Sequence, residues 1–396
     1  MPMRILSVVG ARPNFMKIAP VVSELRRVPE VEHCLVHTGQ HYDQKLSGKF
    51  FEELALPDPD INLQVGSGSH TWQTAEVMKR LEPVLEDFRP DLVIVVGDVN
   101  STLAAALTAV RLGIRVAHIE AGLRSFDLTM PEEINRRVTD TLSDLLFVTE
   151  QSGVTNLQSE GVLAERIFLV GNVMIDTLLR HREGAAKSGI LGKLELEQGN
   201  RVAPYAVLTL HRPSNVDRPE VLEQLLQAVH EVGQELPVFF PVHPRTLARI
   251  RDLGLSHYFN ESLAGTAHGL RALEPLGYMD FLCLMDHSRL VLTDSGGIQE
   301  ETTVLGVPCL TLRQNTERPV TVEKGTNQIV GTDRRRIIEA TQRVLRGDFT
   351  PTEAPPLWDG KAAQRIVAIL LEQLFCEPAA ESVQQTSRNF SPNEHF

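Results

Sequence analysis

The chain has 396 residues, of which 42% are hydrophobic and 23% are charged, and its formal net charge is −12. This length and apolar content predict two globular domains, each with a substantial hydrophobic core. The acidic balance argues against a nucleic-acid or membrane-surface partner, so an anionic ligand must be held by local positive groups.

The first predicted elements are a strand at residues 4–9 and a helix at residues 15–27. Arg12 and Lys17 lie near the start of this helix, where the helix dipole and unpaired N–H groups attract anions. The segment therefore predicts an anion contact, with surface charge beside a helix cap as the alternative. A second strand at residues 33–38 leads into a polar loop.

Acidic residues follow the next two predicted strands. A fully apolar strand at residues 91–96 is followed by Asp98. A strand at residues 115–119 is followed by Glu120. Because ligands of doubly wound sheets bind at the carboxyl edge of such strands, both residues are site candidates. A helix N-cap is the alternative role for each of them.

A further helix is predicted to begin at Pro131, with Glu132 and Arg136 in its first turns. These two side chains are four residues apart and can simply pair, which stabilises a helix by roughly 0.2–0.5 kcal/mol. Strands at residues 145–149 and 167–170 complete the first predicted sheet, and a loose polar stretch at residues 184–200 is predicted to be the linker.

The second half of the chain repeats the alternation of strands and helices. A strand at residues 205–210 is followed by His211 and Arg212, and a strand at residues 237–241 is followed by His243. The predicted helices are at residues 219–235, 278–288, 334–345 and 361–375, and the polar tail at residues 379–396 is predicted to be disordered.

Residues 290–319 carry the clearest binding signal. A predicted strand leads through Ser295, Gly296 and Gly297 into a helix, so backbone N–H groups and a hydroxyl lie at a helix N-terminus that a phosphate can approach closely. Glu301 can accept from a ribose diol, and Arg318 offers a fork of donors suited to a diphosphate. The alternatives are ordinary turn glycines and solvated helix carboxylates.

The run TDSGGIQEE at residues 293–301, with TERP at residues 316–319, resembles the signature of the non-hydrolysing UDP-N-acetylglucosamine 2-epimerases. The resemblance extends from Ile5 to about Leu374. It implies an α/β protein with two Rossmann-like doubly wound domains facing a cleft, the glycosyltransferase-B fold. The implied domains are residues 1–183 on the sugar and acid–base side, joined by a C-terminal helix at 361–376, and residues 201–350 for UDP. The family implies a homodimer that needs no cofactor and no metal.

The resemblance also implies roles for single residues. The implied catalytic residues are Asp98, Glu120, Glu132 and His211. The implied substrate-binding residues are Arg12, Lys17, Arg136, Phe281, Ser295, Gly296, Gly297, Glu301 and Arg318. A possible activator site, for a second UDP-GlcNAc, is implied at Gln40, His41, Arg212 and His243. Relatives that use this activator contribute an Arg-Gln pair where this chain has Ser69 and His70, so we expect weak activation or none.

The implied reaction is the reversible conversion of UDP-GlcNAc to UDP-ManNAc. The C2 hydrogen of a pyranose is not next to a carbonyl, so a base alone does not remove it usefully. If UDP leaves C1 first, the charge that develops there makes C2–H acidic, elimination gives a glycal, and re-addition inverts C2. The scheme needs cations for the diphosphate and carboxylates for the C2 protons. The sequence does not divide these proton-transfer roles among Asp98, Glu120 and Glu132.

Other chemistry is disfavoured by missing motifs. No G-x-G-x-x-G follows a predicted strand, so bound NAD is not expected. The four cysteines (Cys34, Cys283, Cys309 and Cys376) lack metal-ligand spacing and are expected to be reduced thiols. No apolar run approaches the length of a membrane span, and the N-terminus has no signal-peptide core, which predicts a cytoplasmic protein.

Several functions stay open on the sequence alone. A UDP-sugar glycosyltransferase of the same fold needs the same nucleotide domain, although it usually needs one base where this chain offers three carboxylates. A UDP-sugar sensor has no need of that acidic group, and a hydrolysing relative differs only in releasing the sugar. Departures from the family pattern at residues 11–14, at residues 99–101 and at Leu276 also leave open which UDP-2-acetamido sugar is the substrate.

Overall fold

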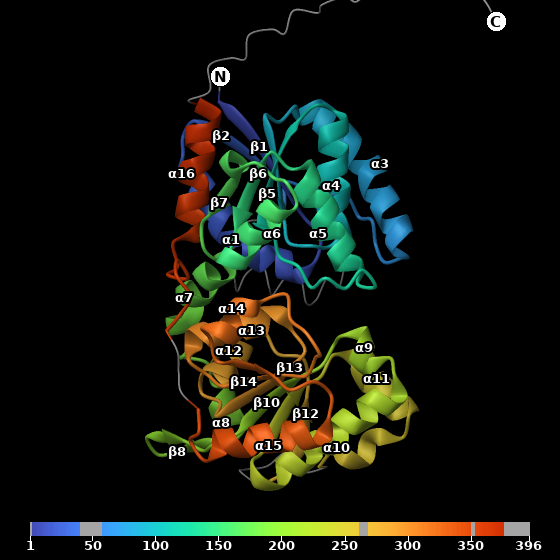
Figure 1. Ribbon diagram of the computed structural model, residues 1–396, viewed down its shortest axis with the longest axis vertical. Helices are drawn as coiled ribbons and strands as arrows, with labels where there is room; N and C mark the ends of the chain where they lie inside the picture. The colour runs from blue at the N-terminus through green and yellow to red at the C-terminus, as the bar shows by residue number, and fades with distance from the viewer. Residues whose placement is uncertain (1, 40–57, 261–267, 350–352, 376–396) are drawn as a thin grey trace, which may run out of the picture.

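The computed structural model describes residues 2–39, 58–260, 268–349 and 353–375, and these form two parallel sheets with flanking helices, one above the other in Figure 1. The predicted α/β class with two Rossmann-like doubly wound sheets is confirmed. Gln40, His41, Cys376 and the tail at residues 379–396 lie outside the described residues.

The first sheet and its helices form what we call the N-terminal half. Its strand order is β3-β2-β1-β4-β5-β6-β7, and each neighbouring pair is parallel. The strands are β1 (Met3–Val9), β2 (Val31–His37), β3 (Ile61–Asn62), β4 (Leu92–Val96), β5 (Arg115–Ala121), β6 (Leu145–Val148) and β7 (Ile167–Leu169). The helices are α1 (Arg12–Leu25), α3 (His70–Phe88), α4 (Asn100–Arg111), α5 (Pro131–Leu142), α6 (Gln151–Ser159) and the short η1 (Ala164–Arg166).

The second sheet and its helices form the C-terminal half. Its order is β12-β11-β10-β13-β14-β15, again with parallel pairs. The strands are β10 (Ala206–Thr209), β11 (Val238–Pro241), β12 (Leu270–Leu273), β13 (Leu290–Thr293), β14 (Cys309–Thr311) and β15 (Asn327–Ile329). The helices are α9 (Pro213–Val216), α10 (Pro219–Glu235), α11 (Pro244–Asp252), η2 (Leu255–Tyr258), α12 (Tyr278–Asp286), α13 (Gly296–Leu305), α14 (Pro319–Glu323) and α15 (Arg334–Leu345).

Apolar burial on both faces explains why these strands are almost continuously hydrophobic. Along β1, Ile5 and Val9 face one apolar cluster while Leu6 and Val8 face another, as the two-residue period of a strand requires. The first of these clusters also contains Tyr205 and other residues of the C-terminal half, so the core is continuous between the halves. Within the described part of the chain, no helix combines the length and the apolar character needed to cross a membrane.

Two helices tie the halves together. Helix α7 (Val173–Ala185) contacts α1 on one side and α12 and α13 on the other. The last helix, α16 (Ala362–Phe375), packs against α1, beside the N-terminal half in Figure 1, and its first N–H groups donate to Asp176 of α7. The stretch at residues 184–200, expected to be a loose linker, is structured. It contains α8 (Ile190–Lys193) and β8 (Glu197–Gln198), which pairs with β9 (Arg201–Val202).

Candidate active site

The candidate site lies at the point in each sheet where the strand order reverses. In the N-terminal half β1 and β4 are neighbours, and the chain continues from β1 toward one edge of the sheet and from β4 toward the other. Ligands are expected at the carboxyl ends of two such strands. In the C-terminal half β10 and β13 have the same relation. The loops after these strands carry Asp98, His211 and Ser295. Ion pairs between the two halves, from Arg212 to Glu132 and from Arg318 to Glu120, bring further predicted residues together.

Glu120 forms ion pairs with cations of both halves. Its buried carboxylate accepts from Lys17 Nζ at one oxygen and from Arg318 Nη2 of the other half at the second oxygen. The prediction that Glu120 follows its strand was wrong, because the residue lies inside β5 at a bulge between Ile119 and Ala121. Its φ of +75° is in the left-handed region, which costs about 1–3 kcal/mol for such a side chain and is common at functional sites.

Asp98 sits just after β4, as predicted, and pairs with an arginine of α5. Arg136 Nη2 donates to Asp98 Oδ2 at 2.6 Å, and Arg136 Nη1 donates to Glu133 at 2.9 Å. The simple pairing of Arg136 with Glu132 is therefore not what the structure shows. Burial raises the pKa of Asp98, but the charges of Arg136, Lys17, Arg318 and Arg212 outweigh it and hold the pKa below its ordinary value. Asp98 is therefore ionised at neutral pH.

Glu132 occupies the first turn of α5 and faces the C-terminal half. Its carboxylate lies 3.9 Å from Arg212 Nη1 and is 37% exposed, so it is the most accessible of the three candidate carboxylates. Asn135, on the same helix, donates to the backbone carbonyl of Asp98 at 2.9 Å. Helix α5 thus carries the candidate carboxylate Glu132 and holds the backbone of a second candidate, Asp98.

In the C-terminal half, Asp294 organises the loop after β10. This buried carboxylate accepts from the backbone N–H groups of His211 and Arg212 at 3.0–3.2 Å and from His211 Nδ1 at 2.9 Å. Burial raises the pKa of Asp294, but His211 and these hydrogen bonds outweigh it and lower the pKa. The His211 side chain stays 51% exposed, with its Nδ1 fixed on Asp294.

The Ser-Gly-Gly turn begins α13 as predicted. Ser295 is the N-cap residue, yet its side chain makes no capping hydrogen bond, so the hydroxyl is left for another partner. At Gly296 an added Cβ would come within 2.6 Å of Glu317 Oε1, so only glycine fits between the helix start and that carboxylate. The first turn of α13 therefore presents backbone N–H groups beside the Glu317 carboxylate.

Two buried carboxylates that the sequence did not single out surround Arg318. Glu300 Oε1 lies 2.6 Å from Arg318 Nε, and burial raises the pKa of Glu300 to about 8 although Arg318 opposes this. Glu317 pairs with Arg313 at 2.8 Å and Arg212 at 3.3 Å. Burial raises the pKa of Glu317, but the arginines around it outweigh burial and lower the pKa.

The other predicted residues have varied surroundings. Glu301 is buried and accepts from the Tyr278 hydroxyl at 3.2 Å. Phe281 lies on α12 and packs against the core shared by the two halves. Arg12 begins α1, but its side chain lies outside the described part of the structure. His243 is the N-cap of α11 and accepts from Arg245 N at 3.3 Å, in an exposed position.

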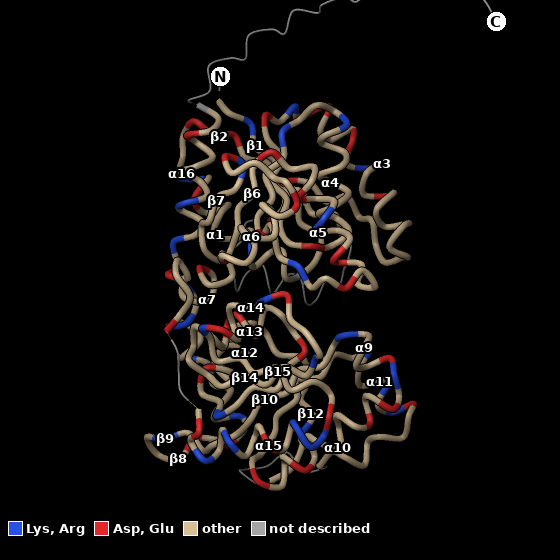
Figure 2. Tube along the Cα trace, viewed as in Figure 1, with Lys and Arg blue, Asp and Glu red and all other residues tan. Residues whose placement is uncertain are grey.

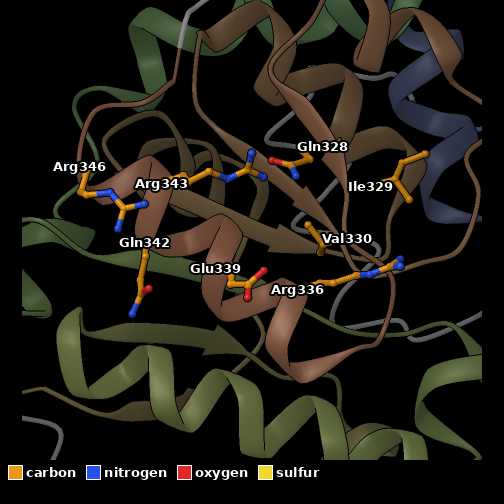
Figure 3. Close-up of a pocket in the computed structure, with 8 residues that line it drawn as sticks. All are labelled: Gln328, Ile329, Val330, Arg336, Glu339, Gln342, Arg343 and Arg346. Carbon is orange, nitrogen blue, oxygen red and sulfur yellow. The ribbon is translucent and has the colours of Figure 1, made fainter.

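A groove of about 540 Å³ lies elsewhere, between β15 and α15 (Figure 3). Arg336, Arg343 and Arg346 line it together with Glu339, and it contains none of the predicted site residues. Among the described residues, no three His, Cys, Asp or Glu side chains are grouped so as to hold a metal ion.

Comparison with known proteins gives matches over most of the chain. A family model described as UDP-N-acetylglucosamine 2-epimerase matches residues 23–371. The chain is 39% identical over 374 residues to the UDP-N-acetylglucosamine 2-epimerase of Methanocaldococcus jannaschii, which covers 93% of this chain and 99% of that protein. It is 38% identical over 371 residues to the UDP-2,3-diacetamido-2,3-dideoxy-D-glucuronate 2-epimerase of Pseudomonas aeruginosa, which covers 93% and 99%. The crystal structure of Methanocaldococcus jannaschii UDP-GlcNAc 2-epimerase in complex with UDP-GlcNAc and UDP matches with a TM-score of 0.84 at 40% identity, over 93% of this chain and 99% of that one.

Proposed function

Because this chain belongs to the UDP-N-acetylglucosamine 2-epimerase family, we propose that it interconverts UDP-GlcNAc and UDP-ManNAc by inverting C2. One observation carries the proposal. Glu120 of the N-terminal half is paired with Arg318 of the C-terminal half, so a proton-handling carboxylate lies directly beside a diphosphate-binding arginine. A sugar nucleotide seated on the C-terminal half places its C1 and C2 at that junction.

Nucleotide binding falls mainly to the C-terminal half. The N–H groups at the start of α13, the Ser295 hydroxyl and Arg318 suit a diphosphate, since cations and helix N-termini bind such anions strongly. His211, fixed by Asp294 and half exposed, can donate to the leaving oxygen. Glu301 is the ribose acceptor, and Lys17 adds positive charge from the other half.

The chemistry falls to the N-terminal half. The C1–O bond to UDP breaks with its electron pair going to UDP, and a carboxylate takes the C2 proton, which leaves the glycal. Re-addition of UDP at C1, with a proton delivered to the opposite face of C2, completes the inversion. Asp98, kept ionised by the cations around it, is suited to accept a proton on one face, and Glu120 and Glu132 are the candidates for the other. Neither NAD nor a metal has a step in this scheme.

The most direct test is to incubate the purified protein with UDP-GlcNAc and EDTA, without nicotinamide, and to follow the sugar by NMR. UDP-ManNAc should appear and reach an equilibrium mixture. Free UDP and free sugar would instead indicate hydrolysis, and a product formed only with an added sugar acceptor would indicate a glycosyltransferase. Because one relative is named for a diacetamido-glucuronate substrate, that UDP-sugar belongs in the same assay as the competing candidate.

We further infer a homodimer, formed through an apolar face over α3, α4 and α5. A groove of about 430 Å³ there is lined mainly by apolar atoms, including Met78, Leu103 and Ile134. Ile134 in this groove is 47% exposed, and a second copy of the chain would cover it. Light scattering on Ile134→Glu tests the inference, which predicts a monomer for the variant and a dimer for the wild type.

A further inference from the structure

A buried ionic network lies beneath the candidate carboxylates. His118 on β5, Asp140 on α5 and Arg124 in the loop after β5 are all buried. His118 Nδ1 lies 2.7 Å from Asp140 Oδ1, and Arg124 Nη1 lies 2.7 Å from Asp140 Oδ2. Arg124 also donates to Glu160 through two nitrogens, at 2.9 and 2.7 Å. None of these side chains is among the predicted site residues.

The hydrogen bonds fix the orientation of the His118 ring. Its Nε2 lies 2.8 Å from the backbone carbonyl oxygen of Gly97, which can only accept. Its Nδ1 faces Asp140, which also accepts from Gly122 N at 3.1 Å and from Arg124. The ring is therefore held between the Gly97 peptide and the Asp140 carboxylate.

The surroundings of Asp140 keep it ionised. Burial raises the pKa of Asp140, but the hydrogen bond and charge of His118 and the charge of Arg124 outweigh it and lower the pKa. Asp140 therefore accepts at both oxygens, from His118 at one and from Arg124 and Gly122 N at the other. Glu160, at the exposed end of the network, pairs with both Arg124 and Arg137.

The network holds the two backbone segments that carry Asp98 and Glu120. His118 pins the carbonyl of Gly97, whose N–H donates to Ile119 O at 3.0 Å. Gly97 has φ +69°, and an added Cβ there would lie 3.1 Å from Lys17 Nζ and 3.3 Å from Glu120 Oε2, so its peptide is the floor of the site. On the other side, Asp140 holds Gly122 N, two residues beyond the strained Glu120.

We propose that His118 and Asp140 are a positioning pair for the epimerase reaction, in which the His118 ring sets the Gly97–Asp98 turn and Asp140 sets the backbone after Glu120. The inference rests on the proposed function, since it assigns the pair to the carboxylates of that reaction. Neither residue touches the sugar, and both act through the geometry of Asp98 and Glu120.

The pairing can be tested without any activity. In protein labelled with ¹⁵N-histidine, the ring N–H of His118 that faces Asp140, identified by its loss in His118→Gln, should exchange slowly with solvent in the wild type and rapidly in Asp140→Asn. Unchanged exchange in Asp140→Asn would overturn the proposal, whether or not the protein proves to be an epimerase.

The positioning role is tested by kinetics. His118→Gln keeps a donor for Gly97 but loses the bond to Asp140, and it should lower kcat on the order of 10²-fold, as small displacements of catalytic groups do. Its Kd for UDP should match the wild type. His33→Gln is the matched control, because His33 is also on a strand of the first sheet, where it bonds Ser7 at 2.9 Å, and it should leave kcat unchanged.

Asp140→Asn should resemble His118→Gln, and the double variant should be no slower than the slower single variant, because the two residues act as one unit. Wild-type kcat in either single variant would overturn the proposal, as would an equal loss in the His33→Gln control. If instead the wild type fails to epimerise any UDP-sugar while the ring signals are as expected, it is the proposed function that fails. If His118→Gln does not fold, Asp140→Asn and the ring signals decide the proposal.

Discussion

The two sides of the site hold their charges in different ways. In the N-terminal half, Glu120 and Asp98 are each paired with a cation, and Glu120 sits on a strained backbone at φ +75°. In the C-terminal half, the anion-binding groups are the start of a regular helix at Ser295, whose φ is −88°. The comparison teaches that backbone strain lies on the side to which we assign proton transfer, and regular helix geometry on the side to which we assign the nucleotide.

Charged side chains of both halves meet at the junction. Figure 2 shows acidic and basic segments on both sides of the junction between the halves. Lys17 of the N-terminal half and Arg318 of the C-terminal half both pair with Glu120, so the cations meet at one carboxylate. If the division is real, substitutions in one half should change turnover, and substitutions in the other should change UDP affinity.

The largest effect is expected from the carboxylates. Asp98→Asn, Glu120→Gln and Glu132→Gln should each lower kcat by roughly 10²- to 10⁴-fold, because each removes a proton-transfer group or its charge. The Kd for UDP, measured by calorimetry, should stay close to that of the wild type. Glu82→Gln, exposed on α3, is the control and should leave both values unchanged. Near-normal kcat in all three variants would disprove the proton-handling role.

The opposite pattern is expected from the helix start of the C-terminal half. In Gly296→Ala the new Cβ meets Glu317 Oε1 at 2.6 Å and crowds the phosphate position. Losing one charge-assisted contact of about 1.5–3 kcal/mol weakens UDP binding by about one to two orders of magnitude. Gly189→Ala, where an added Cβ meets nothing within 4 Å, is the matched control. Unchanged UDP affinity in Gly296→Ala would show that the nucleotide lies elsewhere.

Activation by a second UDP-GlcNAc also bears on the comparison, because the implied activator site includes residues of both halves. Ser69 is the N-cap of α3, where it accepts from Trp72 N, and His70 bonds Asn100 at 3.1 Å, so neither supplies the charge of an arginine. We expect UDP-ManNAc to react without added UDP-GlcNAc. Without an arginine, UDP-GlcNAc should bind the activator site about one to two orders of magnitude more weakly. Assays that start from UDP-ManNAc alone measure this. An absolute requirement for UDP-GlcNAc would contradict it.

The smallest effect concerns stability at Glu300. Its pKa is raised to about 8, so folding favours the protonated form. The stability that this preference contributes is fully present below the ordinary carboxyl pKa. It is lost as the pH rises through the pKa of Glu300 in the folded protein. Glu300→Gln should therefore gain stability over the wild type with increasing pH, by at most about 1.4 kcal/mol per pH unit, as urea unfolding can measure. Exposed Glu339→Gln should show a flat difference, and an equally flat difference for Glu300→Gln would refute the assignment.

The sequence predicts the fold well, and it points to residues that the structure gathers at the candidate site, because both depend on local patterns. Apolar strands followed by Asp98 or by Ser295 mark the ligand edge, and the structure brings the two edges together. The sequence could not reveal that Glu120 lies inside β5, since the bulge depends on pairing with β6. The difference between Glu300 and Glu301 also depends on tertiary packing around Arg318 rather than on local pattern.

Side-chain pairing was the least predictable feature. Helical spacing favours Glu132 with Arg136, but Arg136 turns instead to Glu133 and to Asp98, a residue 38 positions away in the chain. His118 gave no signal at all, because a histidine within an apolar strand resembles an ordinary core residue. Only its two partners, contributed by Gly97 and α5, distinguish it from such a residue.

The central claim is that C2 loses its proton during the reaction while UDP is detached from C1. The measurement that tests it most directly is incubation of the protein with UDP-GlcNAc in D2O, with the C2 position of both epimers examined by NMR and mass spectrometry. The account predicts deuterium at C2 in UDP-ManNAc and, as the reaction reverses, in UDP-GlcNAc. Conversion to UDP-ManNAc with the original hydrogen retained at C2 in both sugars would contradict it.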